Sequence, residues 1–240
     1  MKKVVLNFIL CFFIVNNIHS QSFDRFSAQI MDTLYSIDCK LPKDFIDLKT
    51  NAIFHSYDKN ADFLARVLGM SYCPVIQSLD EHCMVMYYPS YLLKKHLDLG
   101  KLISGKEKNR NIQHRNQMNS NLKVIAGSDV YKFDKYVTIW SQDRSRSIFN
   151  ADSVFTFNIP VPSKQPYKEI YTKSMAMYIT KYDRAYIAII WFFTKNGYKN
   201  RQKYIDAFCK TIWYKDEWTP DEEKIQKVRW NGYCNDSHWE

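Results

Sequence analysis

The most reactive-looking group in the chain is the run Asp80-Glu81-His82-Cys83, which places an acid, an imidazole and a thiol at the entrance of a predicted strand. Adjacent residues of a strand point to opposite faces of the sheet. Because His82 and Cys83 would point apart, they cannot act as a local pair of base and nucleophile. The pattern favours a structural role for this run, and we assign no catalytic residue.

The motifs that usually carry catalysis or cofactor binding are missing. The sequence has no Gly-x-Ser-x-Gly elbow, no His-Glu-x-x-His helix, no Walker loop and no Gly-x-Gly-x-x-Gly turn. Only six glycines are present, which leaves little material for a backbone phosphate cradle. His55 near Asp58 and His96 near Asp98 are isolated and indicate surface or structural histidines. We therefore predict no cofactor and no metal.

Two arginines in a charged segment are the first candidates for binding. Arg144 and Arg146 lie with Asp143 and Asp152 in a loop predicted between two strands, where a rigid scaffold commonly presents binding groups. A guanidinium can hold a carboxylate, sulfate or phosphate through two parallel hydrogen bonds. The alternative is an ordinary charged turn whose members pair with one another.

A basic segment over residues 94–123 provides the second set. Its acids are Asp98 and Glu107, and its cations are Lys94, Lys95, Lys101, Lys106, Lys108, Arg110, Arg115 and Lys123. Such a segment could bind an anionic glycan, a nucleic acid or a lipid surface, and the candidate ligand residues are Lys106, Lys108, Arg110 and Arg115. Since the segment lacks interleaved aromatic residues for stacking, the alternative is a solvated loop.

Tryptophans near the C-terminus form the third set. Aromatic residues make up 16% of the chain, and Trp213, Trp218, Trp230 and Trp239 crowd toward its end. Exposed indole rings stack on sugars or anchor proteins, so Trp218 and Trp230 predict a protein or glycan partner of unknown identity. The alternative is that these rings lie in the core or cover the sheet.

The N-terminus is typical of a secretory signal peptide over residues 1–20. Lys2 and Lys3 precede an apolar stretch from Val4 to Val15, and the small Ser20 precedes a cleavage site before Gln21. We expect an exported protein, periplasmic or extracellular, with no transmembrane segment after removal of the signal. The formal charge of +9 becomes +7 when Lys2 and Lys3 leave.

The number and spacing of the cysteines limit which disulfides could form after export. Cys11 follows the bulky Leu10 inside the apolar stretch and does not fit a lipoprotein cleavage site. The mature chain keeps an odd number, which cannot pair completely: Cys39, Cys73, Cys83, Cys209 and Cys234. A bridge between Cys73 and Cys83 is our first expectation, with buried free thiols as the alternative. None of the five has the paired spacing of a zinc site.

Residues 171–215 organise the rest of the chain. Residues 174–180 alternate in period two, residues 181–184 interrupt the pattern, and residues 185–194 form an unbroken apolar run. This pattern predicts a hairpin whose second strand is central and covered on both faces.

A closing helix is predicted after this hairpin. Asn196-Gly197 indicates a turn, and Asn200 is expected to cap the helix. Its buried face would comprise residues at helical spacing, namely Ile205, Phe208, Cys209 and Ile212.

The other expected elements follow from spacing and from breakers. Predicted helices cover residues 23–34, 58–68 and 91–102. Predicted strands lie within residues 33–40, 83–88, 122–126, 136–140 and 153–159. Residues 105–121 have no periodicity and predict a long loop.

Together these elements predict one α+β domain over residues 21–217, followed by a polar aromatic tail over residues 218–240. The domain would hold an antiparallel sheet of about six or seven strands with helices packed on one face. An early strand running into Leu41-Pro42-Lys43-Asp44-Phe45, a strand ending at Tyr88-Pro89, and a closing helix ending at Ile212-Trp213-Tyr214 resemble the PsbP-like α/β/α sandwich family. The chain also resembles small uncharacterised exported proteins of Gram-negative bacteria. Neither resemblance implies an activity.

The predicted function is that of a secreted, non-enzymatic binding or accessory module. Two alternatives stay open. One is an exported hydrolase whose acid/base pair is assembled from distant carboxylates. The other is binding of an anionic polymer through the basic segment.

Overall fold

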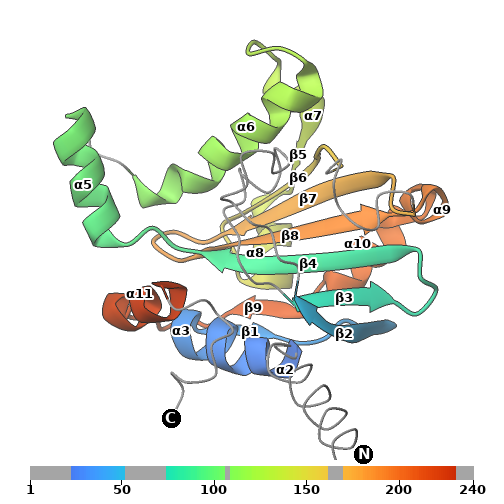
Figure 1. Cartoon of the computed structure of the whole chain (residues 1–240), viewed down its shortest axis with the longest axis horizontal. Helices are drawn as coiled ribbons and strands as arrows, with labels where there is room; N and C mark the ends of the chain where they lie inside the picture. The colour runs from blue at the N-terminus through green and yellow to red at the C-terminus, as the bar shows by residue number, and fades with distance from the viewer. Residues whose placement is uncertain (1–22, 52–73, 106–108, 162–169, 231–240) are drawn as a thin grey trace, which may run out of the picture.

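A seven-stranded antiparallel sheet carries the fold (Figure 1). The strand order is β2-β3-β4-β8-β7-β6-β5, so β8 lies in the middle. The strands are β2 (Phe45–Asn51), β3 (Pro74–Ser78), β4 (Cys83–Ser90), β5 (Val137–Ile139), β6 (Ser153–Asn158), β7 (Lys173–Thr180) and β8 (Tyr186–Phe193). Two runs of sequential strands, β2 to β4 and β5 to β8, join where β4 pairs with β8 along its full length. The predicted α+β class is confirmed.

The computed structural model describes residues 23–51, 74–105, 109–161 and 170–230. The predicted signal peptide, the predicted helix over residues 58–68, and His55, Cys73, Lys106, Lys108, Cys234 and Trp239 lie outside these residues. Of the helices within the described ranges, none combines the length and the apolar character that a bilayer span requires.

The central hairpin is as predicted. Every residue of β8 is buried, because apolar layers cover both faces of the sheet. β7 and β8 pair from Lys173↔Phe193 to Ile179↔Ile187. A tight turn joins them, and in it the Arg184 amide donates to the carbonyl of Lys181 at 3.1 Å.

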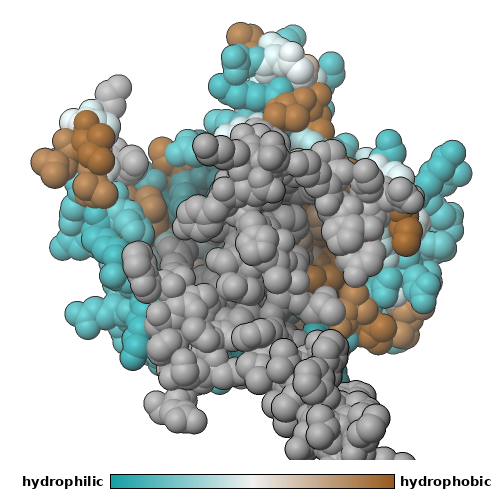
Figure 2. Space-filling model, in the orientation of Figure 1, coloured by the Kyte–Doolittle hydropathy of each residue, from teal (hydrophilic) through white to brown (hydrophobic). Residues whose placement is uncertain are grey.

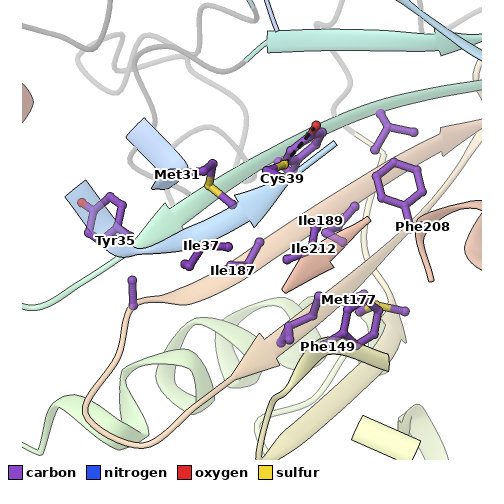
Figure 3. Packing of buried hydrophobic residues seen from close by; sticks show 14 of the residues in the cluster. Met31, Tyr35, Ile37, Cys39, Phe149, Met177, Ile187, Ile189, Phe208 and Ile212 are labelled. Atoms are coloured by element: carbon purple, nitrogen blue, oxygen red, sulfur yellow. Dashed lines mark hydrogen bonds between the residues drawn. The ribbon is translucent and has the colours of Figure 1, made fainter. Parts of the chain in front are cut away.

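One face of the sheet is covered by both ends of the described chain. A continuous helical segment comprises α2 (Phe23–Arg25), the π-helix η1 (Phe26–Asp32) and α3 (Thr33–Tyr35). A small second sheet pairs β1 (Ile37–Cys39) with β9 (Ile212–Tyr214). Figure 3 shows side chains of this segment and of both short strands packed against Ile187 and Ile189 of β8.

Three further helices complete this layer: α8 (Gln142–Phe149), α10 (Arg201–Phe208) and α11 (Glu222–Trp230). Phe149, Phe208 and Ile225 bring each of them into the same core. Trp218 also packs against this core, as does Val228 of α11.

The opposite face is covered mainly by α6 (Gln113–Ala126), whose Met118 and Leu122 are fully buried on the sheet. We expected helices on one face only. We also predicted a loop over residues 105–121 and a strand over residues 122–126, and both predictions are wrong. The helix was hidden because Asn and Gln fill many of its positions and leave a narrow apolar stripe.

The remaining elements lie between β4 and β5 and after β8. They are α5 (Lys94–Ser104), the 3₁₀ turn η2 (Arg110–Ile112), α7 (Phe133–Tyr136) and α9 (Lys195–Lys199). Asn196-Gly197 is therefore helical rather than a turn, and Thr194 caps α9 by accepting from the Gly197 amide at 3.0 Å. α10 ends at Phe208, and Ile212 belongs to β9 instead of to the predicted helix.

Other differences concern two strands, a proline and a thiol. β2 and β3 were not predicted, because their residues show no clear alternation of apolar and polar side chains. Pro89 lies inside β4 rather than after it. Cys83 is a buried free thiol, so the expected bridge to Cys73 is wrong for this residue and the alternative holds.

Gly197 provides a test of how α9 packs. A Cβ atom at this position would lie 2.1 Å from the backbone oxygen of His82. We expect Gly197→Ala to lower the free energy of unfolding by about 1–3 kcal/mol, because a backbone carbonyl cannot move away cheaply. Urea denaturation measures this change. The exposed Lys199→Ala on the same helix should stay within about 0.5 kcal/mol of the wild type. A Gly197→Ala variant as stable as the wild type would contradict the packing.

Candidate functional site

A pocket of about 150 Å³ lies where the β7–β8 turn meets the start of α6. We call it the Arg184 pocket. Three stretches of chain form it: residues 110–115 from η2 and α6, residues 152–155 at the start of β6, and residues 180–186 around the turn. Its lining residues are Arg110, Asn111, His114, Arg115, Asp152, Ser153, Phe155, Thr180, Lys181, Tyr182, Arg184 and Tyr186. Cations dominate this lining.

The turn is tied to the two elements that face it. Asn111 Nδ2 donates to Asp183 Oδ1 at 3.0 Å, and the Asp183 amide donates to Asn111 Oδ1 at 2.7 Å. The Tyr182 amide donates to Asp152 Oδ2 at 2.8 Å. Asp183 takes φ 54°, the left-handed conformation that lets the turn present its amides in this way. These bonds hold the pocket walls in a fixed relation.

Arg184 is the most unusual residue of the pocket because its buried guanidinium donates hydrogen bonds to backbone carbonyls and forms no direct ion pair, although the charge of Asp216 acts on it from a distance. Nη1 donates to the carbonyl of Lys215 at 2.7 Å, and Nη2 donates to the carbonyls of Tyr35 and Ser36 at 2.9 and 3.1 Å. Nε is buried with no hydrogen-bond partner. Within the described chain no carboxylate forms an ion pair with Arg184. Burial lowers its pKa, but a guanidinium stays charged at neutral pH.

His114 is a second buried polar group at the pocket. Its ring stacks on Phe155 with centroids 5.2 Å apart and lies 6.1 Å from the Tyr186 ring. Burial, with a smaller contribution from the adjacent Arg115, lowers the pKa of His114 to about 4. The imidazole is therefore neutral at pH 7. Its Nε2 is buried and has no hydrogen-bond partner.

The other cations of the pocket differ in how far they are neutralised. Arg110 is paired with Glu222 at 3.1 Å and lies over the Tyr91 ring. Lys181 Nζ donates to the carbonyl of Asn150 at 2.9 Å, so its charge has no partner carboxylate within the described chain. The Arg115 side chain is exposed at the rim. The pocket lining thus carries several positive charges, and two of its residues, Arg184 and His114, each have a buried nitrogen without a hydrogen-bond partner.

This chemistry suits an anionic oxygen group. Guanidinium and ammonium groups form short, strong hydrogen bonds with carboxylate, sulfate or phosphate oxygens. Asp152, the carboxylate in the lining, already accepts a bond from the turn. No cluster of three metal-ligating side chains occurs within the described ranges.

Only part of the sequence-predicted set gathers here. Arg110 and Arg115 line the pocket. Arg144 and Arg146 do not; they lie on α8, which the sequence analysis took for a loop. Residues two apart on a helix do not face each other, and the Arg144 guanidinium stacks on Trp140 at 3.7 Å.

Trp218 and Trp230 have separate positions. The Trp218 ring packs edge-on against Tyr91, and its Nε1 donates to the carbonyl of Leu34 at 3.0 Å. The Arg184 guanidinium lies over the Trp218 ring, 4.9 Å from its centroid, so Trp218 packs against the residue that lines the pocket. This position agrees with the alternative that the tryptophan covers the sheet. The side chain of Trp230 lies outside the described part of the molecule.

Sequence reasoning missed Arg184, His114 and Lys181. Arg184 and Lys181 looked like the ordinary charges of a hairpin turn, and His114 lay in a stretch without visible periodicity. One signal was available: a cation directly beside the most apolar run of the chain must be either at the surface or held by specific partners.

The Asp80 cluster forms a second polar site, on a different edge of the molecule. Asp80 Oδ2 accepts from Lys203 Nζ at 2.7 Å and from Tyr204 Oη at 2.9 Å, and Oδ1 accepts from Ser78 Oγ at 2.6 Å. Burial acts to raise the pKa of Asp80, but these hydrogen bonds outweigh it and hold that pKa well below its usual range. A carboxylate so fully occupied is structural.

His82 and Cys83 behave as the strand geometry predicts. The His82 ring contacts Thr194 and Asn196, while the Cys83 thiol is buried and its pKa is raised well above the usual value by burial. They do not form a pair.

Comparison with known proteins found no matching family model, no matching curated protein and no matching solved structure. A function can therefore be proposed only from the geometry of the Arg184 pocket.

The low pKa of His114 makes stability depend on pH. An unfolded histidine titrates near 6.5, whereas folded His114 titrates near 4. Between these values the unfolded chain binds a proton that the folded chain does not, so the free energy of unfolding falls as pH falls. The loss is at most about 3 kcal/mol. Urea denaturation over this pH range should show a smaller fall for His114→Gln than for the wild type. The exposed His96→Gln should keep the wild-type slope; equal slopes in all three proteins would contradict the burial of His114.

Proposed function

We propose that the protein is an exported, non-enzymatic binding module that holds an oxyanion group of its ligand in the Arg184 pocket. The observation that carries this proposal is the buried Arg184 guanidinium, which has no carboxylate partner among the described residues and keeps one nitrogen unbonded. Export is proposed from the N-terminal sequence, with its two lysines and apolar stretch.

The free energy of a buried charge supports an anionic ligand. A buried cation without a counter-ion is unfavourable, and carbonyl dipoles offset only part of the lost hydration. An oxyanion in the pocket would supply negative charge near Arg184, and the exposed Arg115 at the rim would donate hydrogen bonds to it.

The size of the pocket limits what can enter. Pockets that enclose drug-sized ligands measure about 300–1,000 Å³, whereas the Arg184 pocket holds about 150 Å³. It suits a sulfate, a phosphate or a carboxylate, either free or at the end of a larger molecule whose remainder stays outside. The proposal therefore names the class of group and leaves the rest of the ligand open.

Binding accounts for the arrangement better than catalysis does. The carboxylate of the pocket, Asp152, holds the turn through the Tyr182 amide. Arg184 is fixed by three carbonyls, which suits a static anion holder. The two alternative functions, a hydrolase and a protein that binds anionic polymers, stay predictions. The membership in the PsbP-like family suggested by the resemblance also stays a prediction.

Sulfate binding to the purified protein tests the proposal by titration calorimetry at constant ionic strength. We expect saturable binding of one sulfate per chain. Arg115→Gln and Lys181→Gln should each weaken it by about three- to tenfold, since each removes a charge-assisted contact that solvent partly screens. Phosphate and acetate, titrated in the same way, rank the oxyanions.

A matched variant separates the pocket from general charge. Arg201→Gln removes one exposed arginine from α10, away from the pocket lining. It should leave the sulfate affinity within about twofold of the wild type, because exposed charges beyond a Debye length are screened. If Arg201→Gln weakens binding as much as Arg115→Gln, or if none of the three anions binds saturably, the proposed function is wrong.

A further inference from the structure

Helix α5 leaves the sheet after β4 and stands apart from it (Figure 1). Among its eleven residues Gly100 alone is buried, so none of its side chains enters the core. Tyr91 and Leu93, just before the helix, are buried and anchor its start. An isolated helix of this length is marginal in water. Packing against the core therefore does not explain why α5 has exposed apolar side chains.

One face of α5 is apolar and exposed. Leu99, Leu102 and Ile103 have the spacing i, i+3, i+4 that places side chains on one side of a helix. Their exposed fractions are 52%, 82% and 76%. Figure 2 shows the resulting apolar patch over the outer part of α5. Single exposed leucines are ordinary, but three on adjacent turns form a patch that marks an interaction.

Positive charge borders this patch. Lys94 and Lys95 occupy the first turn of α5, on the side of the helix next to the apolar face. Both lysines are exposed, and Asp98 is the acidic residue of the helix. Apolar side chains beside lysines on a short helix are the pattern of a segment that lies at a membrane interface, where anionic headgroups attract the lysines.

Charge and area favour a lipid surface over other occupants. A stable protein interface buries about 800 Å² on each partner and involves about 20–30 residues a side. Three apolar side chains at the end of a projecting helix are far fewer than that. An anionic polymer would use the lysines but would leave the leucines and the isoleucine in water.

We propose that α5 is a peripheral docking element for an anionic lipid surface. Leu99, Leu102 and Ile103 enter the boundary between headgroups and acyl chains, and Lys94 and Lys95 meet the headgroups. This site is separate from the Arg184 pocket and does not depend on the ligand proposed there.

Flotation with vesicles tests the proposal. The purified protein is mixed with vesicles of equal parts phosphatidylglycerol and phosphatidylcholine, or of phosphatidylcholine alone. We expect binding to the first and little to the second. The double variant Leu102→Ser/Ile103→Ser should bind at least tenfold more weakly, because its side chains no longer gain from leaving water. Lys94→Gln/Lys95→Gln should lose about fivefold per lysine.

Controls make each outcome decisive. Leu79→Ser/Val130→Ser removes two side chains that are 62% and 87% exposed elsewhere, and it should bind vesicles as the wild type does. Retention of Leu102→Ser/Ile103→Ser on a heparin column should match the wild type. Undiminished vesicle binding by this variant, or equal binding to both lipid mixtures, would overturn the proposal. So would a dimer in lipid-free sedimentation that the variant abolishes, since the patch would then be a protein interface. If this variant does not fold, the lysine variant alone decides: vesicle binding that it does not weaken would overturn the proposal.

Discussion

The structure depends on the way in which Arg184 joins the two sheets. Its guanidinium reaches from the turn of the large sheet to the carbonyls of Tyr35, Ser36 and Lys215, which lie beside the ends of the small sheet. Hydrogen bonds from a charged donor to buried carbonyls are strong, because little water competes with them. The same residue carries a net charge and lines the Arg184 pocket. One side chain therefore contributes both to joining the two sheets and to lining the pocket.

The small sheet makes this arrangement rigid. β1 and β9 come from opposite ends of the described chain, and Tyr214 of β9 places its hydroxyl within hydrogen-bonding distance of the carbonyls of Ile179 and Ala185, on either side of the turn. Lys215 pairs with Asp32 at 2.6 Å and with Asp38 at 3.2 Å. These ion pairs are partly exposed and contribute little each. The buried hydroxyl and guanidinium contacts hold the turn in place, so the pocket is formed before any ligand arrives.

The elements that could be predicted from the sequence are those decided by residues close together in the chain. The β7–β8 hairpin was predictable, because a β-branched and aromatic run beside an alternating strand is a local pattern. α6 and α8 were not, since polar residues fill most of their positions and the tertiary packing of Met118 or Phe149 decides them. The pocket was predictable only in part. Arg110 and Arg115 stood out because they lie in a segment dense in positive charge. Arg184, in contrast, is held by the carbonyls of Tyr35 and Ser36, which are 149 and 148 residues away in the sequence. No local spacing in the sequence reveals such a contact.

Glu222, near the C-terminal end of the described chain, reduces the net positive charge of the pocket by pairing with Arg110. Glu222 of α11 accepts hydrogen bonds from Arg110, from the Lys94 amide at 2.7 Å and from the Tyr91 hydroxyl at 3.3 Å. It thereby fixes the point where the chain leaves β4 for α5 and neutralises Arg110. The pocket cations that form no ion pair with a described carboxylate are then Arg115, Lys181 and Arg184. In the proposed function, the exposed Arg115 and the partly buried Lys181 would bind the anion directly, so dissolved salt would compete with it. The buried Arg184 would contribute charge from below the pocket surface.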